Sequence, residues 1–190
     1  MVGGNVASLP TKAAIAIQLG IAGLVCLLFQ IPLGAETGPE PDAKAAFLVN
    51  FLKFANFPSQ HRFSGNGKVR IACLGLDPVF QGLTNLQSKM NSRIEVSSYQ
   101  TLPSSLDAEL VVIGSSEVAS FPGVLSELRD KTIFTASEIK DFARDGGMLE
   151  FGYSTNRINY QINIDEVRSH HLQVSSRLLK LGAGKGEGKQ

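Results

Sequence analysis

Residues 69–78, VRIACLGLDP, have the pattern of a strand that passes directly into a helix. The apolar run Ile71–Leu74 is typical of a strand buried on both faces of a parallel sheet. Gly75 ends that run, Asp77 is a suitable N-cap, and Pro78 fits the first turn of a helix that we expect to reach about Met90. This stretch predicts a strand-to-helix unit of the α/β class.

Two further units of the same kind follow along the chain. Residues 110–117, LVVIGSSE, combine a second buried strand with a turn, and a helix is expected to run to about Leu128. A third strand is expected over Thr132–Thr135, with Ser137 as the N-cap of a short helix over Glu138–Arg144. Strands that alternate with helices predict a mixed, mainly parallel sheet with helices on both faces, in a single three-layer domain.

The segment before residue 69 is predicted to be an amphipathic helix over Ala43–Asn56, with Asp42 as its N-cap. Phe47, Phe51 and Phe54 recur on one face of it at helical spacing. They could form a docking face for a partner helix. A chain with eleven Phe and no Trp needs such residues for its core, so core packing is the preferred interpretation.

The remaining strands are expected to be less buried. Arg93–Tyr99 alternates apolar and polar residues, and Met148–Tyr153 and Arg157–Ile164 are predicted to pair as an antiparallel hairpin. A closing helical segment, capped by Asp165, is expected to end in a helix over Ser175–Leu181.

The first 35 residues have the features of an export signal. Lys12 precedes an uncharged run that reaches Ala35, which offers a small residue for peptidase cleavage. The run is also long enough for a retained membrane anchor, but its glutamines and glycines favour cleavage. We therefore expect a signal peptide over residues 1–35, a folded domain over 36–181 outside the cytoplasm, and a disordered Gly/Lys tail over 182–190.

The composition excludes several classes of function. The chain has 18 Lys and Arg and 17 Asp and Glu, so removal of Lys12 with the leader leaves no net charge, and nucleic-acid binding is not expected. Only Cys73 would survive cleavage, which leaves no internal disulfide. No nucleophile motif, phosphate-binding loop or zinc motif is present, and the adjacent His170 and His171 cannot face one metal together. We expect no enzyme, no metal and no cofactor.

Two groups of residues are candidates for binding. The first lies where parallel strands end and helices begin, a place where α/β sheets commonly bind ligands: Gly75, Asp77, Ser115, Ser116 and Ser137. The alternative is that Asp77, Ser116 and Ser137 are ordinary helix caps.

The second group is a polar ladder on the last strand, with two cations from the closing segment. Its members are Arg157, Asn159, Gln161, Asn163, His171 and Arg177. Arginine pairs well with carboxylates, and histidine could tune binding with pH. The alternative is that these side chains simply cover an open sheet face.

Blocks of sequence spread over Lys44–Leu181 resemble, in order and spacing, the YfiR family of periplasmic proteins. The blocks are KAAFLVNFLKF (44–54) followed by Phe57-Pro58, IACLG (71–75), VIGSSE (112–117), Phe142–Met148, INI (162–164) and SSRLLKL (175–181). The resemblance implies an α/β domain exported to the periplasm. The best-known member represses a membrane-bound diguanylate cyclase by binding its periplasmic sensory domain, which lowers cyclic di-GMP and biofilm formation.

The resemblance implies a partner for this chain, the periplasmic domain of an inner-membrane signalling protein, and a homodimer is compatible with it. The same domain also occurs in other sensory settings. A periplasmic small-molecule binding module, with its ligand at the strand-end crevice, is therefore the alternative function.

Family members with a redox switch use cysteine pairs, and this chain departs from that pattern. Cys73 matches the first-strand cysteine of one pair, but Ala108-Glu109 occupies the place expected for its partner. The region Gly146–Tyr153, where a second pair could lie, has no cysteine. Disulfide control is therefore not expected here.

Overall fold

The computed structural model describes residues 39–57, 68–90 and 93–183. The expected signal peptide and its cleavage point, the turn at residues 65–67 and most of the expected tail lie outside these residues. The described part of the chain belongs to one compact unit.

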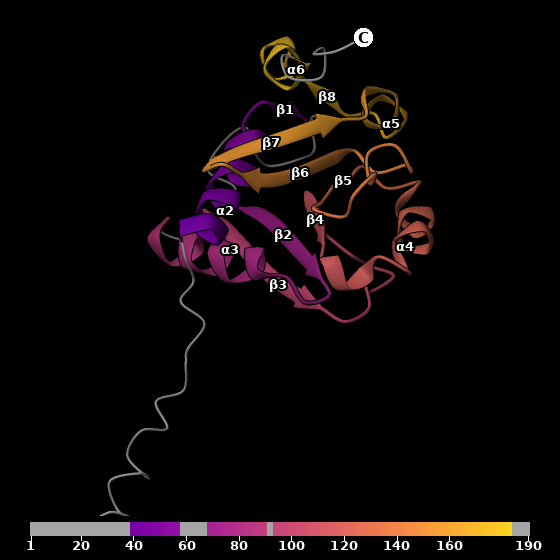
Figure 1. Ribbon diagram of the computed structural model, residues 1–190. Helices are drawn as coiled ribbons and strands as arrows, with labels where there is room; N and C mark the ends of the chain where they lie inside the picture. Colours follow the sequence, from indigo (N-terminus) through magenta and orange to yellow (C-terminus); the bar gives the residue numbers. More distant parts are fainter. Residues whose placement is uncertain (1–38, 58–67, 91–92, 184–190) are drawn as a thin grey trace, which may run out of the picture. The chain divides into compact units, whose positions relative to one another are not determined.

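A six-stranded sheet forms the centre of this unit, in the order β3-β2-β4-β5-β6-β7 (Figure 1). The first five of these strands are parallel neighbours, and β7 is antiparallel to β6. Their bounds are β2 Val69–Leu74, β3 Ile94–Tyr99, β4 Leu110–Ile113, β5 Phe134–Ser137, β6 Leu149–Ser154 and β7 Arg157–Ile162. The mainly parallel α/β sheet predicted from the sequence is confirmed.

Each face of the sheet has its own apolar core. Helices α2 (Pro39–Leu52) and α3 (Pro78–Lys89) contribute Leu48, Phe51 and Leu83 to the core on one face. Helix α4 (Phe121–Leu128) contributes its first and last residues to the core on the other face. Alternate residues of β2 and β4 enter the two cores, because successive side chains of a strand point to opposite faces. The three-layer arrangement is therefore confirmed.

The last strands form the expected hairpin. Thr155 and Asn156 adopt left-handed backbone conformations, which are the conformations required at the two central positions of a tight hairpin turn. Helix α5 (Ile164–Ser169), strand β8 (Gln173–Val174) and helix α6 (Ser176–Ala183) follow. Strand β8 pairs with β1 (Ala55–Asn56) as a separate two-stranded sheet, which the sequence did not predict.

Four local predictions were wrong. Helix α2 begins at Pro39, because prolines fit a first helical turn, so Asp42 is inside the helix and is not its cap. Strand β5 begins two residues later than expected, at Phe134, and no helix follows it. Residues 140–146 form turns instead, with Asp141 in a left-handed conformation (φ 65°). Asn163 caps α5, not Asp165.

The phenylalanine stripe is divided between the core and the surface. Phe51 is buried and packs against Phe134, and Phe47 packs against Tyr160, with ring centroids 5.2 Å apart in both pairs. Phe54 lies beyond the end of α2 and is 41% exposed. Phe47 and Phe51 therefore pack in the core, as the preferred interpretation predicted.

Candidate binding surface at the carboxyl edge of the sheet

The strand order reverses between β2 and β4, since the helix after β2 covers one face and the helix after β4 covers the other. Two loops leave the sheet at this point, Gly75–Asp77 and Gly114–Glu117, and the second contains the 3-10 turn η1 (Ser115–Glu117). Such a reversal is where open α/β sheets commonly bind their ligands. We call this end of the parallel strands the carboxyl edge.

The structure brings four predicted site residues together at the carboxyl edge. The hydroxyl of Ser116 accepts a hydrogen bond from the backbone N–H of Leu76 at 3.0 Å. The carboxylate of Asp77 accepts from the N–H of Val79 at 2.8 Å and of Ser115 at 3.3 Å. Gly75 adopts a left-handed conformation (φ 78°), and a Cβ there would lie 2.4 Å from the Ser116 oxygen.

These contacts close the two loops onto each other. Asp77 is the N-cap of α3, because its carboxylate accepts from the N–H of Val79. Ser116 accepts from a loop N–H, that of Leu76, and does not cap a helix. A ligand at this crevice stays a prediction, and its binding would require the loops to separate.

Ser137 lies at the end of β5 and does not face the two loops with a free hydroxyl. Its side chain is fully buried, donates to the carbonyl of Ile113 at 2.7 Å and accepts from the N–H of Ile139 at 3.1 Å. It therefore stabilises the end of β5, although no helix begins there.

A buried ion pair completes the carboxyl edge. Lys44 of α2 is 7% exposed, and its Nζ lies 2.6 Å from a carboxylate oxygen of Glu138 and 2.6 Å from one of Glu40. Burial lowers the pKa of Lys44, but the hydrogen bonds and charges of the two carboxylates outweigh it and leave the pKa above its usual value. Apart from a lysine near the start of a helix, no local pattern in the sequence predicts this pair.

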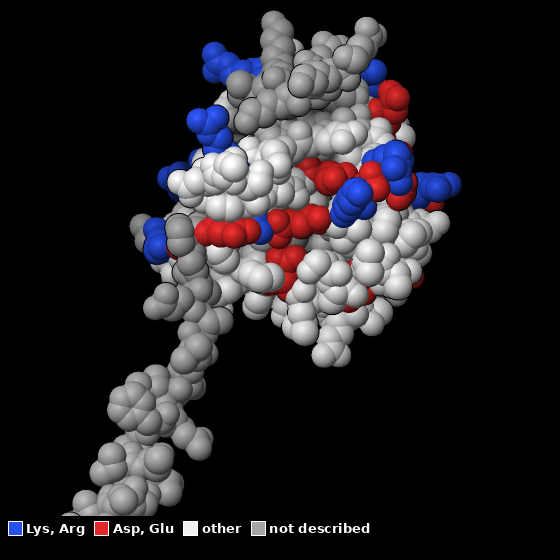
Figure 2. Space-filling view, viewed as in Figure 1, with Lys and Arg blue, Asp and Glu red and all other residues white. Residues whose placement is uncertain are grey.

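Glu138 shows the opposite balance. Burial raises the pKa of this carboxyl, Lys44 lowers it, and the charges of Asp77 and Glu40 raise it further, with a net increase. Lys44 and Glu40 of α2 therefore interact electrostatically with Glu138, which follows β5, and Asp77 of the loop after β2 also acts on Glu138. Figure 2 shows acidic side chains gathered in a band across one face of the molecule.

The polar ladder on β7 is formed in part as predicted. Arg157, Asn159 and Gln161 are exposed, and they alternate with the half-buried Ile158, Tyr160 and Ile162. Asn163 does not belong to this ladder. Its side chain accepts from the N–H of Glu166 at 3.1 Å and donates to the carbonyl of Ala143 at 2.8 Å, because it caps α5.

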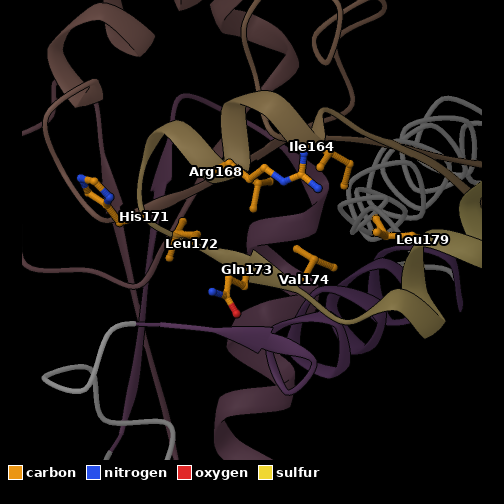
Figure 3. Close-up of a pocket in the computed structure, with 8 residues that line it drawn as sticks. Ile164, Arg168, His171, Leu172, Gln173, Val174 and Leu179 are labelled. Atoms are coloured by element: carbon orange, nitrogen blue, oxygen red, sulfur yellow. The ribbon is translucent and has the colours of Figure 1, made fainter.

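His171 and Arg177 come from other elements. Arg177 is an exposed residue in the first turn of α6. His171 adopts a left-handed conformation (φ 60°) after α5 and lines a pocket of about 500 Å³. Most of the lining residues are apolar, and Arg168, His171 and Gln173 supply polar groups to the pocket surface. The lining residues are Ile164, Val167, Arg168, His171, Leu172, Gln173, Val174 and Leu179. In Figure 3, His171 and Leu179 lie at opposite sides of the group of labelled lining residues.

Cys73 is a free and buried thiol, as expected. Burial raises its pKa to about 12, and the charge of Asp77 adds to this effect. The residue opposite Cys73 on β4 is Val112, and Glu109 instead lies beside Arg70. Ala108 and Glu109 therefore do not lie opposite Cys73, and neither these residues nor Val112 is a cysteine.

Glu109 takes part in an ion pair that the sequence did not reveal. Its side chain is almost fully buried, accepts from the backbone N–H of Arg70 at 2.6 Å, and lies 2.7 Å from the Arg70 guanidinium. The pair links two neighbouring strands of the sheet, because Arg70 belongs to β2 and Glu109 directly precedes β4.

Within the described ranges, no group of three or more His, Cys, Asp or Glu side chains is arranged to hold a metal ion. None of the helices that the structure describes has the length and apolar character needed to cross a bilayer.

Comparison with known proteins agrees with the resemblance seen in the sequence. A search of curated proteins found no match. A family model described as YfiR/HmsC-like matches residues 41–183, which run from the third residue of α2 to the end of α6. This match covers far more than half of the chain, and the protein therefore belongs to the YfiR/HmsC-like family.

Proposed function

We propose that this protein is a periplasmic regulator that represses a membrane-bound diguanylate cyclase, or a related sensor, by binding its periplasmic domain. The observation that carries this proposal is the family match over residues 41–183. Binding of a protein partner holds the membrane enzyme inactive and lowers cyclic di-GMP. A homodimer is part of the proposal, since a symmetric regulator fits a symmetric receptor.

The geometry of the carboxyl edge supports a role by surface contact. The side chains of Asp77 and Ser116 already accept from three backbone N–H groups of the crevice, those of Leu76, Val79 and Ser115. Fewer donors are therefore left there for a small anionic ligand, which favours contact with a protein surface. No turnover of a substrate is needed for such a role.

Deletion of the gene in its native cell tests the proposal. We expect cyclic di-GMP to rise several-fold and to return to its normal level when the full-length chain is restored. A strain that also lacks the cyclase should show no rise. Unchanged cyclic di-GMP in the deletion strain would count against repression of a cyclase.

Export is also part of the proposal, with residues 1–35 as a cleaved leader. N-terminal sequencing of the protein from a periplasmic fraction should begin at Glu36. Recovery of a membrane-bound form that begins at Met1 would support the retained anchor. Folded protein with Met1 in the cytosol would contradict export.

A small-molecule binding module is the second candidate, and the pocket beside His171 favours it. Its volume of about 500 Å³ is in the range of ligand sites, and Arg168 and His171 would suit a carboxylate on a partly apolar ligand. Thermal-shift measurements with such carboxylates provide the test. Loss of the shift in Arg168→Ala and His171→Ala would place the ligand in the pocket, and loss in Ser115→Ala with Ser116→Ala would place it at the crevice.

A further inference from the structure

Two of the most exposed apolar side chains of the described residues share the carboxyl edge. Leu76 is 85% exposed and Val118 is 59% exposed. Leu76 belongs to the loop after β2, and Val118 follows η1 in the loop after β4. The two loops are in contact, since Leu76 donates its N–H to Ser116. Single exposed apolar residues are common, but a pair on adjoining loops forms a surface that burial against another molecule would stabilise.

Each residue of this pair has a carboxylate neighbour in the sequence. Asp77 directly follows Leu76, and Glu117 directly precedes Val118. Behind them lies Glu138, which feels the charges of Asp77 and Glu40. Lys44 is held by two of these carboxylates and is buried, so this part of the edge carries net negative charge.

We propose that Leu76 and Val118 dock a segment of the membrane protein's periplasmic domain in which an apolar side chain is flanked by Lys or Arg. The inference rests on the proposed function and specifies its contact surface. An apolar anchor in a rim of complementary charge is the usual composition of an energetic centre in a protein interface. Basic side chains on the docked segment would pair with Asp77 and Glu117.

The charge of this edge argues against other occupants. A second copy of this chain would place the acidic edge against itself in a two-fold interface, where like charges repel. An anionic lipid surface would be repelled for the same reason. The occupied backbone donors of the crevice leave little for an anionic ligand to bind.

Site-specific photocrosslinking in the native cell tests the contact. A photoreactive amino acid replaces Leu76 or Val118 in the full-length chain, with Phe54 as the matched apolar control. Phe54 is exposed but lies beyond the opposite end of α2 from Lys44 and Glu40. We expect crosslinks from Leu76 and Val118, but not from Phe54, to a periplasmic segment with an apolar residue between Lys or Arg.

Affinity measurements with the purified periplasmic domain of the crosslinked protein give the second readout. Leu76→Ser and Val118→Ser should each weaken binding by about tenfold, and Phe54→Ser should leave it unchanged.

Glu117→Lys should weaken binding strongly at low salt and less at high salt, because screening reduces both attraction and repulsion. Glu95→Lys, an exposed residue near the amino end of β3, is the charge control. Thermal unfolding checks that each variant is folded.

The outcomes separate the docking surface from the function. A membrane protein that crosslinks only from other positions, or that binds the Leu76 and Val118 variants normally, overturns this surface and leaves the proposed function intact. Crosslinks from Leu76 to a second copy of this chain, or to an acidic segment, also overturn it. If no membrane protein crosslinks from any position and cyclic di-GMP is unchanged on deletion, both proposals fail.

Discussion

Lys44 is a cation buried between two carboxylates, and its removal should be costly at neutral pH. Lys44→Met would leave the partly buried Glu138 without its cation, for an expected loss of about 3 kcal/mol in the free energy of unfolding. The pKa of Glu138 is already above its usual value of 4.5 in the folded protein, chiefly because the carboxyl is buried. It therefore takes up a proton more readily when folded, and its ionisation lowers stability as the pH rises through that raised pKa.

Denaturant unfolding of Lys44→Met at two pH values checks this account. Without Lys44 the pKa of Glu138 rises further, so the loss of stability should be large at pH 7 and clearly smaller at pH 4, where the carboxyl is protonated. Lys53→Met, which removes an exposed lysine just after α2, should change stability by less than about 0.5 kcal/mol. An equal loss at both pH values would mean that Lys44 acts by packing alone.

Cys73 should be chemically inert in the folded protein. Its pKa of about 12 leaves almost no thiolate at pH 8, and its side chain is buried. In the protein that begins at Glu36, we expect negligible alkylation by iodoacetamide under native conditions and complete alkylation in denaturant. A reducing agent should leave the unfolding temperature unchanged. Rapid native labelling would show that β2 opens readily.

Helices α2 and α3 approach each other at a single glycine. A Cβ on Gly82 of α3 would lie 2.2 Å from the backbone carbonyl oxygen of Pro41 in α2, and backbone atoms cannot yield as a flexible side chain can. We expect Gly82→Ala to lower stability by roughly 1–3 kcal/mol through overpacking, despite the better helix propensity of alanine.

Gly123 of α4 provides the matched control for this substitution. It is also a helical glycine, but a Cβ there would meet no atom within 4 Å. Gly123→Ala should therefore raise stability by about 0.5–1 kcal/mol, through helix propensity alone. Denaturant unfolding of both variants decides the matter, and a stabilised Gly82→Ala would show that the two helices are not closely packed.

The elements that the sequence predicted best are those with strong local signals. Strands β2 and β4 have their expected bounds, because each contains a run of four apolar residues that ends at a glycine. The predicted range of β5 was two residues too early. Its last residues, Ala136 and Ser137, have little strand propensity and belong to the sheet because they pair with β4 and β6. The two-residue strand β8 has no periodicity to detect.

For the candidate site, the sequence predicted that the two loops meet but did not predict the ion pair beside them. Topology brings Gly75, Asp77, Ser115 and Ser116 together, as the alternation of strands and helices implied. The pair of Lys44 and Glu138 could not be predicted, since a contact between residues so distant in sequence has no local pattern. Exposure of Leu76 and Val118 also depends on the three-dimensional arrangement of their loops.

The two apolar cores cover opposite faces of the middle of the sheet, and this gives the molecule a gradient of stability. All residues of β4 and β5 are buried, whereas β7 alternates exposed and half-buried residues and has β6 as its partner in the sheet. Amides that open only with the whole domain exchange most slowly, and amides at an edge can open locally.

Hydrogen exchange followed by mass spectrometry should therefore show the slowest exchange in β4 and β5. Peptides from β7 should exchange at least ten times faster, because opening an edge strand exposes less of the core. Full exchange of every peptide in denaturant is the control. Equally slow exchange in β7 would mean that its outer edge, with Arg157, Asn159 and Gln161, is covered in solution, and a homodimer formed through that edge would then be the first arrangement to examine.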